Sequence, residues 1–183
     1  MRYEEDDLIR SYQGKTPKIH PTAWVSEAAY VLGDVEIGEY SSVWPGTVIR
    51  GDTIKITIGA YVDIQDNCVV HADENAHYGD YVTLGHGVTC HARTIATHCL
   101  IGNGATLNDG VVLGEYSIVA SGAVVLENKE FPDKSFVAGV PANARDRPTE
   151  ERHHELIRRT AEGYARKAQL FKADGLGSID VDR

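Results

Sequence analysis

The stretch that decides the fold is IHPTAWVSEAAYVLGDVEIGEYSSVWPGTVI, residues 19–49. An aliphatic residue returns at every sixth position of this stretch: Ile19, Val25, Val31, Ile37, Val43 and Ile49. A period of six fits neither an amphipathic helix nor an alternating strand. Hexapeptide repeats are typical of a parallel β-helix, in which three short strands make one triangular coil. The aliphatic residue then points inward, and small residues or glycines ease the corners.

The repeat continues beyond this stretch, with changes of register. Its later inward positions are Ile58, Ile64, Val70, Tyr78, Leu84, Cys90, Ile95, Ile101, Leu107, Leu113, Val119 and Val125. At three hexads per coil, the pattern predicts about six coils, stacked about 4.8 Å apart by strand pairing. After Val125 the repeat is expected to fade into a closing loop. The predicted fold is therefore all-β, a parallel β-helix followed by a C-terminal α-helix.

The chain divides into four predicted parts. Residues 1–18 form an N-terminal lead-in, residues 19–147 the β-helix domain, residues 148–173 the helix, and residues 174–183 a frayed tail. The helix is predicted to be N-capped by Thr149 and to bury one apolar stripe made of Ile157, Ala161, Tyr164, Ala168 and Phe171. We expect this stripe to pack on the prism or on a neighbouring subunit.

Charge and hydropathy narrow the classes of partner. The net charge of −9 argues against nucleic acid and against an anionic membrane as partners. No apolar run approaches the 18 or so residues needed to span a membrane. The acidic N-terminus lacks the apolar stretch of a signal peptide, so a cytoplasmic location is expected.

The register of the repeat places two histidines on one edge of the prism. Arg50, His71 and His91 each follow the third inward residue of their coil, so they should stack one per coil. His71 and His91 are then about 5 Å apart at Cα, which suits two ligands of one metal ion. His86 follows the second inward residue by two positions, in the column of Asp66, and leaves from another edge.

One chain cannot easily bring these three histidines together. In a cyclic homotrimer, one edge of each subunit meets a different edge of the next, which would place His71 and His91 against the neighbour's His86. Three neutral imidazoles leave Zn²⁺ an open position, as in catalytic zinc sites. We therefore predict a metal site shared between adjacent subunits. The alternative is that each histidine is an ordinary solvent-facing or hydrogen-bonded residue of the prism wall.

Four motifs resemble the gamma-class carbonic anhydrases, in the branch that lacks the acidic loop. They are WPGTVIRGD (residues 44–52), IGAYVDIQDNCVVH (58–71), VTLGHGVTCH (82–91) and AGVPANARD (138–146). The resemblance implies a left-handed β-helix, a homotrimer and a metal at each subunit interface, zinc with iron or cobalt as alternatives. It also implies reversible hydration of CO₂ to bicarbonate by a metal-bound hydroxide, with His71, His86 and His91 as the metal ligands.

The resemblance assigns roles to five further residues. Gln65 corresponds to the residue that hydrogen-bonds the metal-bound water. Arg50 and Asp52 correspond to a structural and substrate-side pair, with Asp66 as an ion-pair partner across the interface. Arg50 would either hold bicarbonate or serve only in that ion pair, and we favour the ion pair. Tyr164 is the candidate for the tyrosine proposed to assist from the C-terminal helix, with core packing as its alternative.

The sequence departs from the archetypal enzyme at two places, and two other functions compete with the carbonic anhydrase prediction. Asp63 stands where the archetypal enzyme has Asn, and residues 72–77 are too short to carry the proton-shuttle loop of that enzyme. The competing functions are a CoA-ester thioesterase or acyltransferase of the hexapeptide class, and a non-catalytic trimeric scaffold. An acetyltransferase of this architecture would use one general-base histidine, so the third histidine argues against it.

Overall fold

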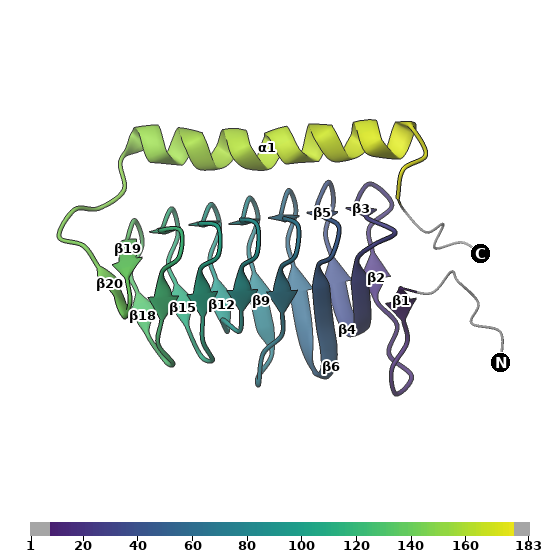
Figure 1. Ribbon diagram of the computed structural model, residues 1–183, viewed down its shortest axis with the longest axis horizontal. Helices are drawn as coiled ribbons and strands as arrows, with labels where there is room; N and C mark the ends of the chain where they lie inside the picture. The colour runs from purple at the N-terminus through teal and green to yellow at the C-terminus, as the bar shows by residue number, and fades with distance from the viewer. Residues whose placement is uncertain (1–7, 178–183) are drawn as a thin grey trace.

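The chain winds into a parallel β-helix with one long helix along its side, as the computed structural model shows for residues 8–177 (Figure 1). The elements are β1 (Ile9–Arg10), β2 (Lys18–Ile19), β3 (Trp24–Val25), β4 (Tyr30–Ile37), β5 (Ser42–Val43), β6 (Val48–Ile58), β7 (Asp63–Ile64), β8 (Val69–Val70), β9 (Ala76–Tyr78), β10 (Thr83–Leu84), β11 (Thr89–Cys90), β12 (Thr94–Ile95), β13 (Leu100–Ile101), β14 (Thr106–Leu107), β15 (Val112–Leu113), β16 (Ile118–Val119), β17 (Val124–Val125), β18 (Glu130–Phe131), β19 (Phe136–Gly139), β20 (Ala142–Ala144) and α1 (Glu151–Ala173).

The hexad register predicted from the sequence is the register of the strands. Ile49 pairs with Val70, and Val70 with Cys90, in successive coils of one face. The inward residues from Val25 onward are buried and form one continuous core along the prism axis, and the partly buried Ile19 packs against it. The stack of β3, β5, β7, β10, β13, β16 and β19 has one strand per coil. The protein is therefore a parallel β-helix of about seven coils.

The prediction of six coils with a fading repeat was wrong at the C-terminal end. Phe131 pairs with Leu113, and Val137 pairs with Val119, in the parallel register of the coils before them. Both residues keep the spacing of six from Val125, and both are buried. At the other end Ile9 pairs with Val31, so part of the predicted lead-in joins the prism. Residues 1–7 of that lead-in lie outside the described residues.

The first change of register lies where the two long strands β4 and β6 pair side by side. In the pairing of β4 with β6, Gly33 lies opposite Gly51, and Val35 lies opposite Ile56. The extra residues of β6 therefore bulge outward without moving the inward positions of the following coil. The bulge begins directly after Gly51 and carries Asp52, two residues beyond Arg50.

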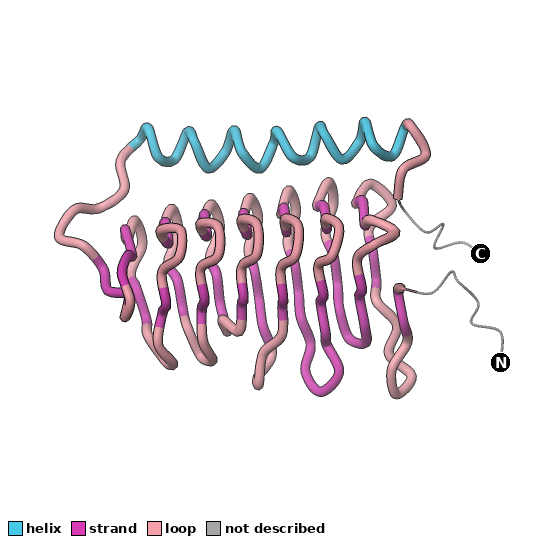
Figure 2. The backbone as a smooth tube through the Cα atoms, in the orientation of Figure 1, coloured by secondary structure: helices cyan, strands magenta, loops and turns pink. Residues whose placement is uncertain are grey.

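Loops turn the chain between the strands of each coil (Figure 2). Two of these corners differ in their residues. One corner has glycine or asparagine in the left-handed region, as expected: Gly46, Asn67, Gly87, Gly104 and Gly122. The next corner has large residues with φ of 54–58°: Tyr40, Tyr61, Tyr81, His98 and Tyr116. Their rings lie 4.7–5.1 Å apart in a continuous ladder. Ring stacking between coils offsets the strain that this conformation imposes on non-glycine residues.

Helix α1 runs along the prism antiparallel to the direction of coiling (Figure 1). Its buried residues are Ile157, Ala161, Ala165 and Ala168. Tyr164 and Phe171 pack against Trp24 and Trp44 of the prism wall. The apolar stripe predicted from the sequence therefore covers the face formed by β3, β5, β7 and β10.

The two ends of the helix differ from the prediction. The N-cap is Glu150, whose backbone N–H donates to His153 Nδ1 at 2.8 Å. Thr149 instead donates its hydroxyl to the Tyr116 carbonyl at 2.7 Å. After the helix, the Leu176 carbonyl accepts a hydrogen bond from the Trp24 indole at 2.7 Å. The start of the tail is therefore held on the prism, and residues 178–183 lie outside the described residues.

No helix within residues 8–177 has the length and apolar character needed to cross a membrane.

Candidate metal centre

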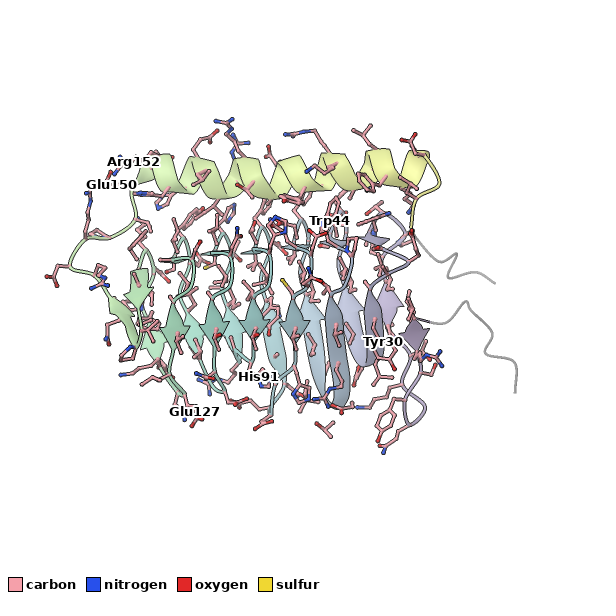
Figure 3. All side chains as sticks on the ribbon, in the orientation of Figure 1. Tyr30, Trp44, His91, Glu127, Glu150 and Arg152 are labelled. Atoms are coloured by element: carbon pink, nitrogen blue, oxygen red, sulfur yellow. The ribbon has the colours of Figure 1, made fainter. Side chains whose placement is uncertain are left out.

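His71 and His91 stack on one edge of the prism, as the register predicts. His71 follows β8 and His91 follows β11, and the His71 N–H donates to the Cys90 carbonyl at 3.1 Å. The two ring centroids are 5.3 Å apart with the rings inclined at 71°. His91 lies on the side of the prism away from α1, whereas Trp44 lies between the prism and the helix (Figure 3). The predicted pair of ligands is therefore adjacent within one chain.

Each histidine of this pair is held by its own carboxylate. Asp52 Oδ1 lies 3.1 Å from His71 Nε2, and Asp109 Oδ1 lies 3.0 Å from His91 Nδ1. Arg50 forms an ion pair with Asp52 in the same chain. Burial raises the pKa of Asp52, but the hydrogen bonds from Arg50 and His71 outweigh burial and leave the pKa lowered. Asp52 thus links Arg50 to His71 within one charged network.

His86 lies on a different edge and has a similar partner. Its Nδ1 is 2.9 Å from Asp66 Oδ2, and its backbone N–H donates to Asn103 Oδ1 at 3.1 Å. Asp66, His86 and Asn103 occupy one column in three successive coils, which confirms the column predicted for the first two. The His86 side chain is 50% exposed, so it is available to a neighbouring molecule.

The donor chemistry of these histidines fits a metal site that needs two chains. Within residues 8–177 of a single chain, no group of three His, Cys, Asp or Glu side chains converges as a metal site. A ligating histidine usually has its second ring nitrogen bonded to a carboxylate or carbonyl group. His71, His86 and His91 all have this arrangement, so each keeps one ring nitrogen for a metal ion. Arg50 and Asp66, predicted to pair across an interface, are engaged with Asp52 and His86 of their own chain.

Gln65 and Asp63 lie on the face covered by α1. They flank the inward Ile64 and are only 4% and 1% exposed. Gln65 Nε2 donates to Asp63 Oδ2 at 2.7 Å, and the Thr83 hydroxyl donates to Asp63 Oδ1 at 2.7 Å. Gln65 also precedes Asp66, the partner of His86, so it lies next to the column of the third histidine.

Tyr164 faces the same region from the helix. Its ring packs edge-on against Trp44 at 5.3 Å, and the Lys167 ammonium lies 4.8 Å from the ring centroid. Burial raises the pKa of the Tyr164 hydroxyl, and the nearby carboxyl groups of Asp63 and Asp66 raise it further. The structure thus places Tyr164 near Asp63 and Asp66, on either side of Gln65, and also gives it a packing role. Its catalytic role stays a prediction.

Two contributors to the site were missed in the sequence. Asp109 comes one position after Asn108, the residue that shares the column of His91 one coil later. Thr83 is the register partner of Asp63, which assigns it the neighbouring position. Asp109 lies outside the four motifs, and Thr83 has no assigned role within its own motif, so neither was recognised as a residue that orients a functional side chain.

The comparisons with known proteins agree with this architecture. A family model described as bacterial transferase hexapeptide (six repeats) matches residues 16–51. Among solved structures, a putative acetyltransferase of Bacillus cereus has a TM-score of 0.83 and 33% identity, covering 89% of this chain and 95% of that one. The similarity covers most of both chains, which supports a common fold.

Curated relatives identify the family more narrowly than the hexapeptide model and the solved structure do. Gamma carbonic anhydrase 1, mitochondrial, of Arabidopsis thaliana is 37% identical over 91% of this chain, which spans only 63% of that protein's length. A carbonic anhydrase of Geobacillus kaustophilus is 37% identical, over 91% of this chain and 92% of its own length. A probable carbonic anhydrase of Methanocaldococcus jannaschii is 46% identical, over 81% of this chain and 94% of its own length. The chain therefore belongs to the gamma carbonic anhydrase family of hexapeptide-repeat β-helix proteins.

Proposed function

We propose that the protein is a metal-dependent carbonic anhydrase-type lyase, which converts CO₂ reversibly to bicarbonate at the subunit interface of a homotrimer. The observation that carries the proposal is the set of three carboxylate-held histidines. Two of them stack 5.3 Å apart on one edge, and the third stands exposed on another edge. A threefold ring is the simplest assembly that presses these two different edges together.

In this assembly His71 and His91 of one subunit and His86 of the next would hold the metal. Zinc is the expected ion, with iron or cobalt as alternatives. A divalent ion held by three neutral imidazoles supplies Lewis acidity at its open position and lowers the pKa of bound water to about 7. The carboxylates of Asp52, Asp109 and Asp66 would fix the orientation of the three imidazole rings.

The other residues act on substrate and water. Gln65 would orient the attacking oxygen through its side-chain amide. Arg50 is 44% exposed beside His71, so its guanidinium is accessible to a bicarbonate anion while it remains paired with Asp52. Tyr164 would assist from the helix. A cytoplasmic location stays a prediction.

A second candidate is acyl transfer or thioester hydrolysis with a CoA ester. It is favoured by the 33% identity and TM-score of 0.83 to the putative acetyltransferase of Bacillus cereus. Acyl transfer of this kind needs one general base and no metal, so it gives no reason for three carboxylate-held histidines. A non-catalytic scaffold likewise leaves this arrangement without a function.

The proposal is tested by metal content and CO₂ hydration of the purified protein. We expect zinc, iron or cobalt to copurify, and His86→Ala to lose the metal and at least about 100-fold of the hydration rate measured by stopped flow. His20→Ala is the matched control, because His20 is exposed and hydrogen-bonds only to Thr22 among the described side chains. Equal hydration rates in wild type and His86→Ala would refute the proposal. Release of CoA from acetyl-CoA by both proteins would instead support the second candidate.

A further inference from the structure

Asp63 and Gln65 are buried neighbours at an unusual position. Both leave the outer side of β7, because Ile64 between them points into the prism. The equivalent pair one coil earlier is Ser42 and Trp44, where the Ser42 hydroxyl accepts the indole N–H at 2.9 Å. A hydroxyl keeps the same charge at every physiological pH. The carboxyl group of Asp63 differs from this hydroxyl because its charge depends on whether it is protonated.

The hydrogen bonds of Asp63 define the orientation of Gln65. Each Asp63 oxygen accepts one bond of 2.7 Å, from the Thr83 hydroxyl and from Gln65 Nε2. An ionised carboxylate can only accept, so the NH₂ end of the Gln65 amide must face it, and Oε1 must face away. A protonated Asp63 gains a donor and can donate to Gln65 Oε1, which favours the reversed amide.

We propose that Asp63 is a positioning residue that selects which end of the Gln65 amide faces the metal site. The inference rests on the proposed function, because it concerns how Gln65 presents itself to a reacting oxygen. With Oε1 outward, Gln65 accepts a hydrogen bond from water or hydroxide. With NH₂ outward, Gln65 donates to the oxygen instead, which suits bound bicarbonate better than an attacking nucleophile.

The environment of Asp63 places the change between the two Gln65 amide orientations near neutral pH. Burial raises the pKa of Asp63 to about 7, although the hydrogen bonds from Thr83 and Gln65 lower it. The charged or titratable groups around it come from α1, from the end of the Gln65 segment and from the turn after β7: Lys167, Tyr164, Asp66 and Cys68. Lys167 is the cation among them and favours the carboxylate. Rising pH therefore favours the ionised state and the orientation with Oε1 outward.

The test follows the carboxyl group and the amide directly, in the full chain with and without zinc. Infrared difference spectra should show a protonated-carboxyl band that grows as pH falls through about 7 and is absent in Asp63→Asn. The side-chain NH₂ signals of Gln65 in NMR spectra should shift with the same midpoint. Thr83→Val removes one donor to the carboxylate, so it should raise the midpoint by about one pH unit, a tenfold change in proton affinity.

The outcomes separate this inference from the proposed function. Without zinc no metal-bound water titrates, so a shift of the Gln65 signals near neutral pH then follows Asp63 and not a metal-bound water. Absence of the band, its persistence in Asp63→Asn, or Gln65 signals that ignore its midpoint would overturn the inference even in an active carbonic anhydrase. Failure of metal binding or of CO₂ hydration would refute the proposed function and leave these spectra unaffected. If Asp63→Asn does not fold, the Thr83→Val shift still decides.

Discussion

At the scale of single residues, the carboxylates would orient the proposed metal ligands, so they matter as much to the proposed site as the histidines. A histidine on a β-helix edge can rotate freely, and a metal site requires one tautomer and one ring orientation. Asp109 provides this for His91 at 3.0 Å, and it is 39% exposed, so its main role is orientation rather than burial of charge. Asp52 does the same for His71 from within the bulge of β6.

Asp109→Asn should therefore weaken metal binding without disturbing the fold. We expect affinity for zinc to fall about 10- to 100-fold, the usual cost of losing a carboxylate behind a ligating histidine. Zinc competition against a chromogenic chelator measures this. Glu127→Gln is the control, since Glu127 is an exposed carboxylate on the neighbouring surface (Figure 3). Equal losses in both variants would show that surface charge, rather than orientation of His91, governs affinity.

At the scale of elements, close packing between coils imposes glycine at particular turns. A Cβ on Gly38 would lie 2.4 Å from the Gly59 carbonyl oxygen, which belongs to the backbone and cannot move aside. Gly163, in the middle of α1, has open space around it within the described structure. The same residue type is thus required by packing at one position and is only a weak helix former at the other.

Substitution of these two glycines by alanine should change stability in opposite directions. Gly38→Ala should lower the free energy of unfolding by about 1–3 kcal/mol because the coils must separate locally. Gly163→Ala should raise it by about 0.5–1 kcal/mol through helix propensity. Urea denaturation of both variants gives the comparison. A neutral Gly38→Ala would mean that adjacent coils tolerate more separation than this structure indicates.

At the scale of the whole molecule, the proposed metal site depends on which edges of neighbouring subunits meet in a homotrimer. His71→Ala and His86→Ala should each lose metal alone. When the two variants are mixed equally, unfolded and reassembled, about a quarter of the interfaces in random cyclic trimers should combine an intact His71–His91 pair with an intact His86. Metal analysis of the reassembled protein measures this recovery. No recovery, with normal reassembly of wild type treated in the same way, would contradict a site shared between subunits.

Much of this protein was determined by its sequence alone. A period of six admits one architecture, and the register then assigned His71 and His91 to one edge and His86 with Asp66 to another. Side chains at the same offset from an inward residue recur once per coil and lie in one column. The offset of a residue in the sequence therefore predicts the edge of the prism on which it lies. The motifs of residues 44–91 indicated the family, because their order and spacing are specific.

Only the tertiary structure decided what lies between columns and between elements. The seventh coil depends on Phe131, which fills an inward position in a stretch predicted from the sequence to be a loop. Thr149 does not cap the helix, because its hydroxyl donates to the Tyr116 carbonyl. Burial of Asp63 under α1 requires the helix to fold back over β7, a contact between residues about 100 positions apart in sequence. The hexad pattern states which way a side chain points, but its solvation and its hydrogen-bond partners depend on what packs over it.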